Sequence, residues 1–292
     1  MRGNPGQLEE SQKKVCSQRN SEALTRQNPA ISLDSTAFAL HRDPTTPIVA
    51  TNAVIKVELH THTADDPVDV IPHSTHQLID RAAELGYGAL AVTLHEHQLD
   101  VRPYAEYARQ RGITLIPGVE RTIEGKHILL LNFSPASMTV LTFADLARLR
   151  AREPGLVVAP HPYFGTSTCV GRLLDAHAEL FDAVEYHGMF TRLVNFNRRA
   201  VQWSKKHGKP MVGNADVHRV EQLGTTYSLV DAPNNADAIC DAIRRGRVRV
   251  EATPLSVHMA ARVLTGMFTS DLRGIFGRTL FHPRTPNERP AR

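Results

Sequence analysis

The sequence predicts an α/β fold, a closed barrel resembling a TIM barrel, in which strands and helices alternate along the chain. Three observations support this prediction. About seven strand–helix units follow one another between residues 54 and 255. Segments such as Ala89–Thr93 are almost wholly apolar, as in strands buried on both faces of a parallel sheet. Polar residues follow several of these segments, at the end of the strand where a barrel gathers its functional groups.

Length and composition fit one large cytoplasmic domain. The chain has 292 residues, and 41% of them are hydrophobic, which is ample for a core. The formal charge of +4 is mild and lies largely in the two tails, so it lends only weak support to nucleic-acid binding. Three scattered cysteines (Cys16, Cys169 and Cys240) without a Cys-x-x-Cys pair favour a reducing compartment. No apolar run is long enough for a membrane span, and no signal-peptide core is seen at the start.

Composition divides the chain into three parts. Residues 1–52 are rich in Gln, Asn, Ser, Arg and Pro without any period, which predicts a disordered leader. Residues 53–255 carry the barrel pattern. Residues 256–292 begin with an apolar stripe at i, i+4 spacing that includes Met259 and Val263, and end in a Pro- and Arg-rich tail. We interpret the stripe as a surface helix on the barrel rather than a partner-binding or membrane-surface helix.

The elements follow from apolar period and from start and stop signals. The first helix shows the pattern best: Ser74 is a good N-cap, Leu78, Ala82 and Leu85 form the buried stripe, and Gly86 ends it. The predicted strands are Val54–Leu59, Ala89–Thr93, Ile113–Ile116, Ile128–Phe133, Leu156–Ala159, Ala183–Glu185, Pro210–Val212, Thr226–Val230 and Arg247–Val250. The predicted helices are Ser74–Leu85, Tyr104–Arg111, Phe143–Arg150, Leu193–His207 and Ala236–Arg245.

Histidines and carboxylates gather where these strands end. His60 and His62 close the first strand, and residues i and i+2 of an extended chain point to the same face, so both imidazoles lie side by side. Asp216 and His218 repeat this spacing near the other end of the domain. The candidate metal ligands are His60, His62, Asp66, His95, Glu120, His161, Asp216 and His218, together with His127 at the start of its own strand. Nitrogen and oxygen ligands without cysteine favour Zn, Mn, Fe or Mg over a structural zinc held by thiolates.

The summed charge of the candidate ligands and ions indicates a class of substrate. Six neutral histidines and three carboxylates are nine ligands, enough for three ions with three protein ligands each. If three divalent ions bind, the ligands leave a formal charge of +3, which suits a phosphate ester better than a neutral amide. Neither a Gly-x-Ser-x-Gly elbow nor a P-loop is present. The expected reaction is therefore hydrolysis by a metal-activated water, without a covalent nucleophile.

The order of these motifs resembles that of the PHP (polymerase and histidinol phosphatase) family. The motifs that carry the resemblance are His60-Thr61-His62-Thr63, Leu94-His95-Glu96, Gly118-Val119-Glu120, Pro160-His161-Pro162 and Asn214-Ala215-Asp216-Val217-His218. The resemblance covers about residues 54–255. It implies a distorted seven-stranded (β/α) barrel with a trinuclear metal site. The implied substrates are phosphomonoesters or phosphodiesters: a small phosphorylated metabolite, a nucleotide or a nucleic-acid end.

The resemblance also implies how the ligands are shared. His60, His62, Glu120 and Asp216 would hold the first ion. Glu120 would bridge to a second ion held by His127 and His161. Asp66, His95 and His218 would hold the third.

The chain departs from the family pattern in three places. The family's first aspartate falls one residue later than Asp66, so Asp65 and Asp69 compete with Asp66, which we favour. The family's Thr-Asp-His is Thr93-Leu94-His95 here, and Glu96 or His97 could replace the lost carboxylate. Tyr163-Phe164 stands where the family has an arginine that contacts phosphate.

Several other polar residues are candidates for the reaction. We consider His97 as a general acid and His187, at the end of its strand, as a substrate or metal contact. Arg192, Arg198 and Arg199 could bind phosphate, although helical arginines are more often solvated. His73 and His76 are expected at the surface, around the start of a helix.

Two other functions remain open. An amidohydrolase-type barrel also begins with His-x-His, but it would need a metal-bridging lysine at a middle strand and a lone final aspartate. This chain has Glu120, not a lysine, at the middle strand, and its final aspartate, Asp216, is accompanied by His218. The other alternative is a barrel that binds metal or a partner without turnover.

Overall fold

The computed structural model describes residues 54–263 and 265. The strands are β1 Val54–Glu58, β2 Ala89–Val92, β3 Thr114–Ile123, β4 Lys126–Leu131, β5 Leu156–Ala159, β6 Ala183–His187, β7 Met211–Asn214, β8 Thr226–Asp231 and β9 Val248–Ala252. The α-helices are α2 Thr75–Glu84, α3 Arg102–Arg109, α4 Phe143–Arg150, α5 Leu173–Ala176, α6 Asn197–His207 and α7 Ala236–Arg244. Short 3₁₀ helices cover η2 Pro135–Thr139, η3 Ala178–Leu180 and η4 Val220–Gln222.

The strands form one nearly closed sheet in the order β7-β6-β5-β4-β3-β2-β1-β8-β9. The α/β prediction is confirmed, but the expected seven-stranded parallel barrel is not, because the sheet has nine strands and mixed directions. Strand β4 runs antiparallel to β3 and β5, and β8 runs antiparallel to β1 and β9. The reversal at β4 follows from a two-residue turn in which Glu124 and Gly125 both have positive φ, as hairpin turns require.

The two ends of the strand order approach each other at β7. Gly213 donates its N–H to Ser228 Oγ at 2.9 Å, and that hydroxyl donates back to the Gly213 carbonyl at 3.1 Å. Beyond β1 and β7, Thr61 and Val217 form an isolated parallel bridge, with the His62 N–H 3.0 Å from the Val217 carbonyl. The sheet is thus drawn together both along β7 and at the rim where the histidines lie.

Gly213 permits this close approach because it lacks a side chain. A Cβ built there would lie 2.7 Å from the Tyr227 carbonyl oxygen and 2.7 Å from Val250 Cγ1. We therefore expect Gly213→Ala to lower the free energy of unfolding by about 1–3 kcal/mol, because β7 and β8 must move apart. Thermal unfolding checks this expectation. An unchanged Tm would show that the contact between β7 and β8 is not important for stability.

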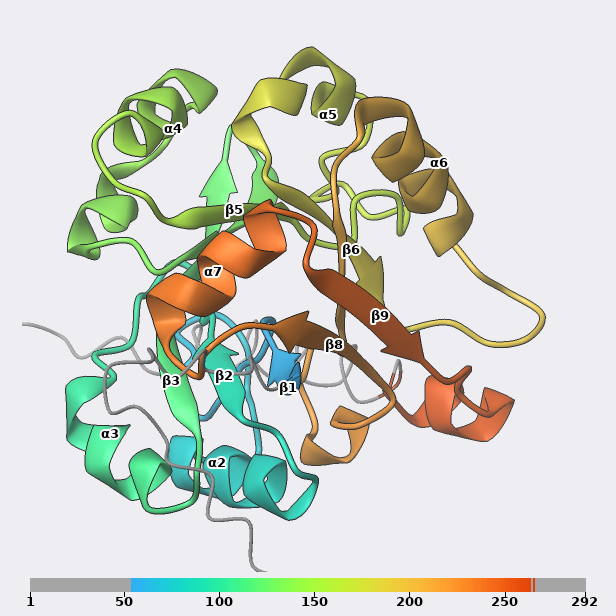
Figure 1. Cartoon of the computed structure of the whole chain (residues 1–292). Coiled ribbons are helices and arrows are strands. Elements are labelled where there is room, and N and C mark those ends of the chain that lie inside the picture. The colour runs from blue at the N-terminus through green and yellow to red at the C-terminus, as the bar shows by residue number, and fades with distance from the viewer. Residues whose placement is uncertain (1–53, 264, 266–292) are drawn as a thin grey trace, which may run out of the picture. The chain divides into compact units, whose positions relative to one another are not determined.

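Side-chain alternation along the strands builds three layers of core. Inward-facing residues such as Val57, Ala91 and Leu129 form the central cluster, and Ile239 and Ile243 of α7 belong to it. Outward-facing residues of the same strands pack under α4, α5 and α6 on one side and under α2 and α3 on the other, as Figure 1 shows. Helix α7 lies against the starts of the parallel strands, where its Arg244 bonds to the Gly155 carbonyl before β5. The polar candidate ligands lie at the opposite end of the barrel.

Most predicted elements are confirmed, and two, α4 and β5, have the predicted bounds. The predicted helix Leu193–His207 ends where expected, but its predicted start was wrong, because α6 begins only at Asn197. The side chains of Thr191 and Asn195 accept backbone hydrogen bonds from Leu193, Val194 and Asn197 and hold the segment in turns.

The predicted segments at the chain ends lie largely outside the described residues. This holds for the whole leader of residues 1–52 and for the tail at 264 and 266–292. Residues 257–263 are helical, and within them Val263 is buried against the barrel. No helix of the described chain is both long and apolar enough to span a bilayer. Cys169 and Cys240, the two cysteines in this part of the chain, are free.

Candidate metal centre

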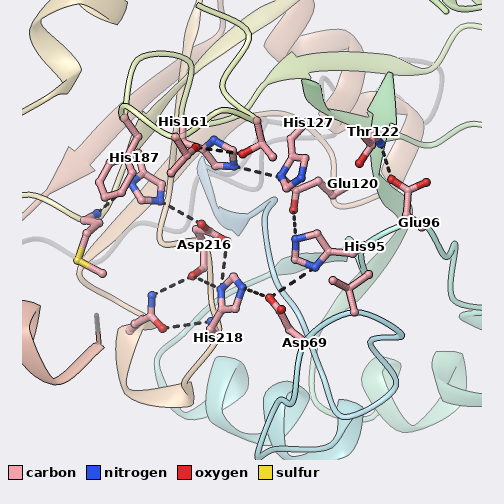
Figure 2. Close-up of a pocket in the computed structure, with 16 residues that line it drawn as sticks. Asp69, His95, Glu96, Glu120, Thr122, His127, His161, His187, Asp216 and His218 are labelled. Atoms are coloured by element: carbon pink, nitrogen blue, oxygen red, sulfur yellow. Dashed lines mark hydrogen bonds and ion pairs between the residues drawn. The ribbon is translucent and has the colours of Figure 1, made fainter. Parts of the chain in front are cut away.

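The candidate ligands gather at the barrel end opposite α7. In β3, Glu120 lies four residues after the inward-facing Ile116, so strand alternation directs its carboxylate into the barrel mouth. His127 starts β4, and because β4 runs antiparallel to its neighbours, its start lies at the same end as the other strands' carboxyl termini. The predicted convergence at one mouth of the barrel is what the structure shows (Figure 2).

Glu120 is the centre of the group. Its Oε2 lies 3.0 Å from His60 Nε2, 3.4 Å from His62 Nε2 and 3.3 Å from His95 Nε2. Its Oε1 lies 2.7 Å from His127 Nδ1 and 3.1 Å from His161 Nε2. The two oxygens of one buried carboxylate therefore face two separate sets of imidazoles, which is the arrangement of a bridging ligand.

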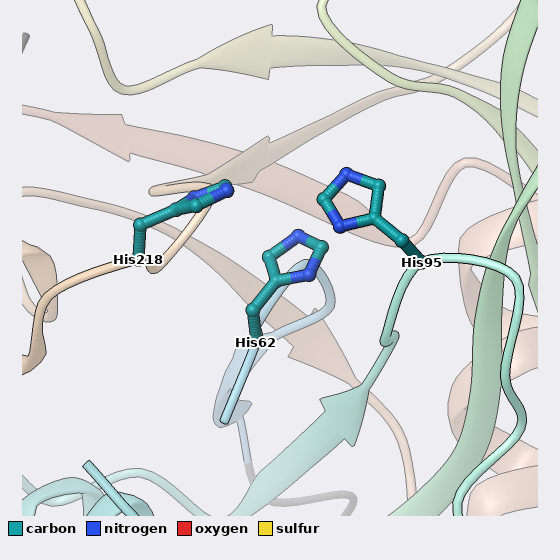
Figure 3. A group of neighbouring side chains, drawn as sticks. All are labelled: His62, His95 and His218. Atoms are coloured by element: carbon teal, nitrogen blue, oxygen red, sulfur yellow. The ribbon is translucent and has the colours of Figure 1, made fainter. Parts of the chain in front are cut away.

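Asp216 also lies beside two of the histidines that face Glu120 Oε2. Its Oδ1 is 3.3 Å from His60 Nε2, 3.4 Å from His62 Nε2 and 3.3 Å from His218 Nδ1. Figure 3 shows His62, His95 and His218 converging, and the His62 ring centroid lies 4.4 Å from that of each neighbour. The bridge between Thr61 and Val217 fixes this side, because it ties the His60-x-His62 segment to the Asp216-x-His218 segment.

Unusual backbone conformations occur at the rim. Glu96, His161 and Asp216 have φ values of 54°, 28° and 51°, which non-glycine residues rarely adopt and which concentrate at functional sites. Leu94 continues the alternation of Leu90 and Val92 in β2 and is fully buried in the apolar layer under α2 and α3. A core side chain thus stands where the PHP pattern has a carboxylate.

The residues present fit divalent metal ions. His62 Nε2, His127 Nδ1 and Asp216 Oδ1 are buried polar atoms without a hydrogen-bond partner of acceptable geometry. Such atoms carry a desolvation cost unless they bind something. Four trios of ligand atoms lie within 4.8 Å of one another, and their members are His62, His95 and His218; His60, Glu120 and His161; His60, His62 and Asp216; His95, Glu120 and His127. Eight of the nine predicted ligands occur in these groups, and imidazole and carboxylate are ligands that Zn, Mn or Fe accept.

Without metal, the group is held together by mutual charge. Burial disfavours the charged form of each imidazole, yet the surrounding carboxylates raise the pKa of His62 to about 10, and the Cys169 thiol together with Glu120 raises the pKa of His161 to about 10. Nearby carboxylates likewise raise the pKa of His218 well above its usual range. Burial likewise opposes ionisation of Glu120 and Asp216, but the surrounding imidazoles lower the pKa of both carboxyls well below the usual range. Metal binding must therefore displace protons from these histidines.

The structure separates the roles of Asp66 and Asp69. Asp66 Oδ1 accepts the N–H groups of Val68 and Asp69, and its Oδ2 lies 2.9 Å from His62 Nδ1 and 3.1 Å from His95 Nδ1. Asp66 thus lies behind two ligands. Asp69 instead lines the pocket, with Oδ2 3.0 Å from His218 Nε2. Asp65 is exposed and bonds to Thr63 and Thr75.

The sequence interpretation missed two fully buried glutamates. Glu185 Oε1 is 3.0 Å from His60 Nδ1 and 2.8 Å from Asn214 Nδ2, while its Oε2 accepts the His161 N–H at 2.5 Å. Glu58 accepts the N–H groups of His60 and Ala215. Both carboxylates orient the segments that carry ligands. A charged residue inside an otherwise apolar strand was the available signal, visible in Val184-Glu185 and Val57-Glu58.

We expect Glu185→Gln to weaken metal binding about 10–100-fold, the usual cost of losing a carboxylate behind a metal-binding histidine. The amide cannot accept at both positions, so it must turn its NH₂ toward His60, Asn214 or the His161 N–H. Competition with a chelator measures the affinity. The matched control is Asp182→Asn, a buried carboxylate at the other end of β6 that binds Arg150, and it should leave metal affinity unchanged. Equal affinities in the two variants would contradict the assignment.

The remaining candidates divide by position. His187 lines the pocket, with Nε2 3.1 Å from Asp216 Oδ2, and its backbone is held by Asn197. His97 is exposed and outside the pocket, because the turn at Glu96 sends the chain outward. The expectation that His73 lies at the surface was wrong: it is 4% exposed.

The arginines considered for phosphate binding do not reach the pocket. Arg192, Arg198 and Arg199 are exposed, and Arg199 stacks on the Tyr163 ring 4.9 Å away. Glu96 does line the pocket, but its carboxylate is bound by the Arg121 guanidinium and by the Thr122 N–H.

A pocket of about 370 Å³ opens over the ligands. Its lining residues are Val68, Asp69, His95, Glu96, Glu120, Thr122, His127, His161, Phe164, Thr166, Thr168, His187, Met189, Asp216, His218 and Gln222. The fold and this pocket together define a class of protein: an α/β barrel with a multi-histidine metal-ligand cluster at its mouth.

Comparisons with known proteins find matches to PHP-related proteins. Residues 194–248 match the family model PHP_C, described as PHP-associated. Over 65 residues the chain is 38% identical to the PolC-type DNA polymerase III of Caldanaerobacter subterraneus subsp. tengcongensis. That match covers 22% of this chain, and the chain spans only 5% of the polymerase.

Two solved structures have a similar fold. One is a two-domain protein from Bacteroides vulgatus that contains a predicted PHP-like metal-dependent phosphoesterase, with a TM-score of 0.55, 19% identity and coverage of 75% of this chain and 70% of that one. The other is PsfC from Pseudomonas syringae, with a TM-score of 0.50, 17% identity and coverage of 78% and 99%. At these identities the likeness concerns the fold. With the motifs on the barrel rim, these matches support the resemblance of the chain to the PHP domain family.

Proposed function

We propose that the chain is a metal-dependent phosphoesterase that hydrolyses phosphomonoesters or phosphodiesters. One observation carries the proposal: the buried Glu120 presents each of its oxygens to a different set of imidazoles beneath an open pocket. Divalent ions, when bound, would supply an activated water and neutralise charge on the phosphoryl group. Mn, Zn, Fe and Mg are the candidate ions, and three are expected from the ligand count.

The chain's own residues would hold and orient these ions. Within the ligand set proposed from the sequence, we replace Asp66 by Asp69 as the carboxylate beside His95 and His218, because only Asp69 faces the pocket. Asp66 then orients His62 and His95 from behind. Glu185 does the same for His60.

His187 is the candidate contact for the leaving oxygen. Its Nδ1 accepts the Met189 N–H at 3.3 Å, which places the proton of the neutral ring on Nε2. That N–H faces Asp216 at the pocket wall, where it could donate a hydrogen bond to a leaving oxygen. We no longer propose His97 as a general acid, because it does not line the pocket.

Two alternatives are less well supported. An amidohydrolase would need a bridging lysine, and the residues lining the pocket include none. A binding barrel without turnover would not require His127 and Asp216, each with a buried atom that makes no well-aligned hydrogen bond, to line an open pocket.

Elemental analysis followed by a screen of phosphomonoesters, phosphodiesters and amides with Mn supplied distinguishes the three functions. We expect bound transition metal and phosphoester hydrolysis. Bound metal with amide hydrolysis alone would favour the amidohydrolase, and bound metal with no hydrolysis would favour the binding protein.

A further inference from the structure

The pocket differs chemically between its floor and its walls. The floor consists of the metal ligands. The walls carry apolar side chains, Val68, Phe164 and Met189, and the hydroxyls of three threonines. No lysine or arginine is among the described residues that line the pocket.

The arginine next to Glu120 is already engaged. Arg121 has a side chain that is only 7% exposed, pairs with Glu96 and donates to the Val140 carbonyl. This pair also neutralises the Glu96 carboxylate, the charged group of the walls. A substrate with several negative charges would therefore find no positively charged side chain on the walls to pair with.

The apolar wall is packed from behind. Phe164 and Met189 belong to a cluster with the buried Leu255 and Val263, which brings the helical segment 257–263 against this side of the pocket. The Phe164 ring also lies edge-on to His187 at 5.0 Å and to Phe196 at 5.3 Å. Contacts on several sides hold the ring in place beside His187.

We infer that this pocket selects a phosphoester whose alcohol portion is uncharged and carries a planar or apolar group, and that Phe164 determines this specificity. The phosphoryl group would lie at the floor. The organic group would lie against Phe164 and Met189, on the side of His187, where the leaving oxygen emerges. This inference rests on the proposed phosphoesterase function.

The test compares benzyl phosphate with ethyl phosphate, whose leaving alcohols have similar acidity. Methyl diesters of the same alcohols replace them if the enzyme cleaves diesters. For the metal-loaded protein we expect a lower KM for the benzyl ester. Phe164→Ala should raise that KM about three- to tenfold, the usual range for a lost aromatic contact, and should leave the KM for the ethyl ester within about twofold.

Two further variants separate specificity from folding. Phe164→Leu keeps an apolar wall and should lose only part of the preference. Tyr163→Ala removes the neighbouring aromatic ring, which does not line this pocket, and should leave the KM ratio of the two esters unchanged. If Phe164→Ala unfolds at a much lower temperature, the KM values of the two esters are compared in Phe164→Leu instead. Equal changes for both esters, or none, would overturn the inference.

Benzylphosphonate and ethylphosphonate make the result independent of turnover. If the metal-loaded wild type hydrolyses no phosphoester, the proposed function fails, but the binding of these two compounds still reports on the pocket. Tighter binding of benzylphosphonate that Phe164→Ala abolishes would support the specificity. Equal affinities would overturn it.

Discussion

Glu120→Gln should lose hydrolysis by on the order of 10³-fold or more and should retain less metal. Removing a single transition-state donor already costs about 10²–10³-fold in enzymes, and Glu120 faces five histidines at once. The amide keeps the shape of the carboxylate but removes its charge, and one of its two ends becomes a donor. That NH₂ must face either the set with His60 or the set with His127. Metal analysis and steady-state kinetics on the same preparation measure both effects.

The matched control is again Asp182→Asn. It neutralises a carboxylate that is as well buried but lies at the far end of β6, where it bonds to Arg150 and the Val157 N–H. This control should cost stability while keeping metal and activity. Circular dichroism must show a folded barrel in both variants. Full activity in Glu120→Gln would remove the basis of the metal-centre assignment.

Metal-free protein should lose stability as the pH rises from about 6.5 to about 10. His62 and His161 hold their protons more tightly in the folded chain than at their ordinary pKa of 6.5, since their folded pKa is about 10. The folded state therefore binds more protons than the unfolded state in this interval, and stability must fall with pH. Glu58, whose pKa burial raises well above its usual range, acts in the same direction from about pH 4.5.

The acid side has the opposite sign. The lowered pKa values of Glu120 and Asp216 contribute stability above their ordinary range, and this contribution is lost as the pH falls through their folded values. Thermal unfolding of chelator-treated protein should thus show a maximum in weak acid, between about pH 4.5 and 6.5.

Metal loading should reverse the alkaline trend, because only unprotonated imidazoles bind an ion. Adding Zn or Mn at pH 8 in a weakly buffered solution should release protons, and Tm should then hold or rise between pH 6.5 and 8. A flat profile for the metal-free protein, or metal binding without proton release, would contradict the charge distribution described for the site.

Sequence reasoning identified most of the side chains that the structure brings together at the barrel mouth, because strand alternation acts locally. His60 and His62, or Asp216 and His218, share a face whatever the rest of the fold does. The bounds of α4 and β5 were also predicted to the residue. Both elements have clear local signals: α4 begins after a capping box at Thr142, and β5 is apolar throughout. The family motifs then ordered the ligands around one mouth.

The positions that sequence reasoning did not anticipate lie where the backbone turns. The left-handed turn at Glu96 carries His97 away from the pocket, and the turn that Asp66 stabilises brings Asp69, rather than Asp66, to the pocket wall. Neither conformation follows from residue spacing. Glu185 was missed because its importance comes from three contacts, with residues that follow β1 and β5 and with Asn214 of β7, which only the assembled barrel brings together.

The bridge between Thr61 and Val217 joins positions 156 residues apart in the chain. The trio of His62, His95 and His218 takes two members from the first part of this span and one from just beyond it, so this trio cannot form in any fragment that stops short of residue 218. During synthesis, an ion could be captured with full affinity only after almost the entire domain had left the ribosome. Ion uptake would then be a late event that reports completion of the domain.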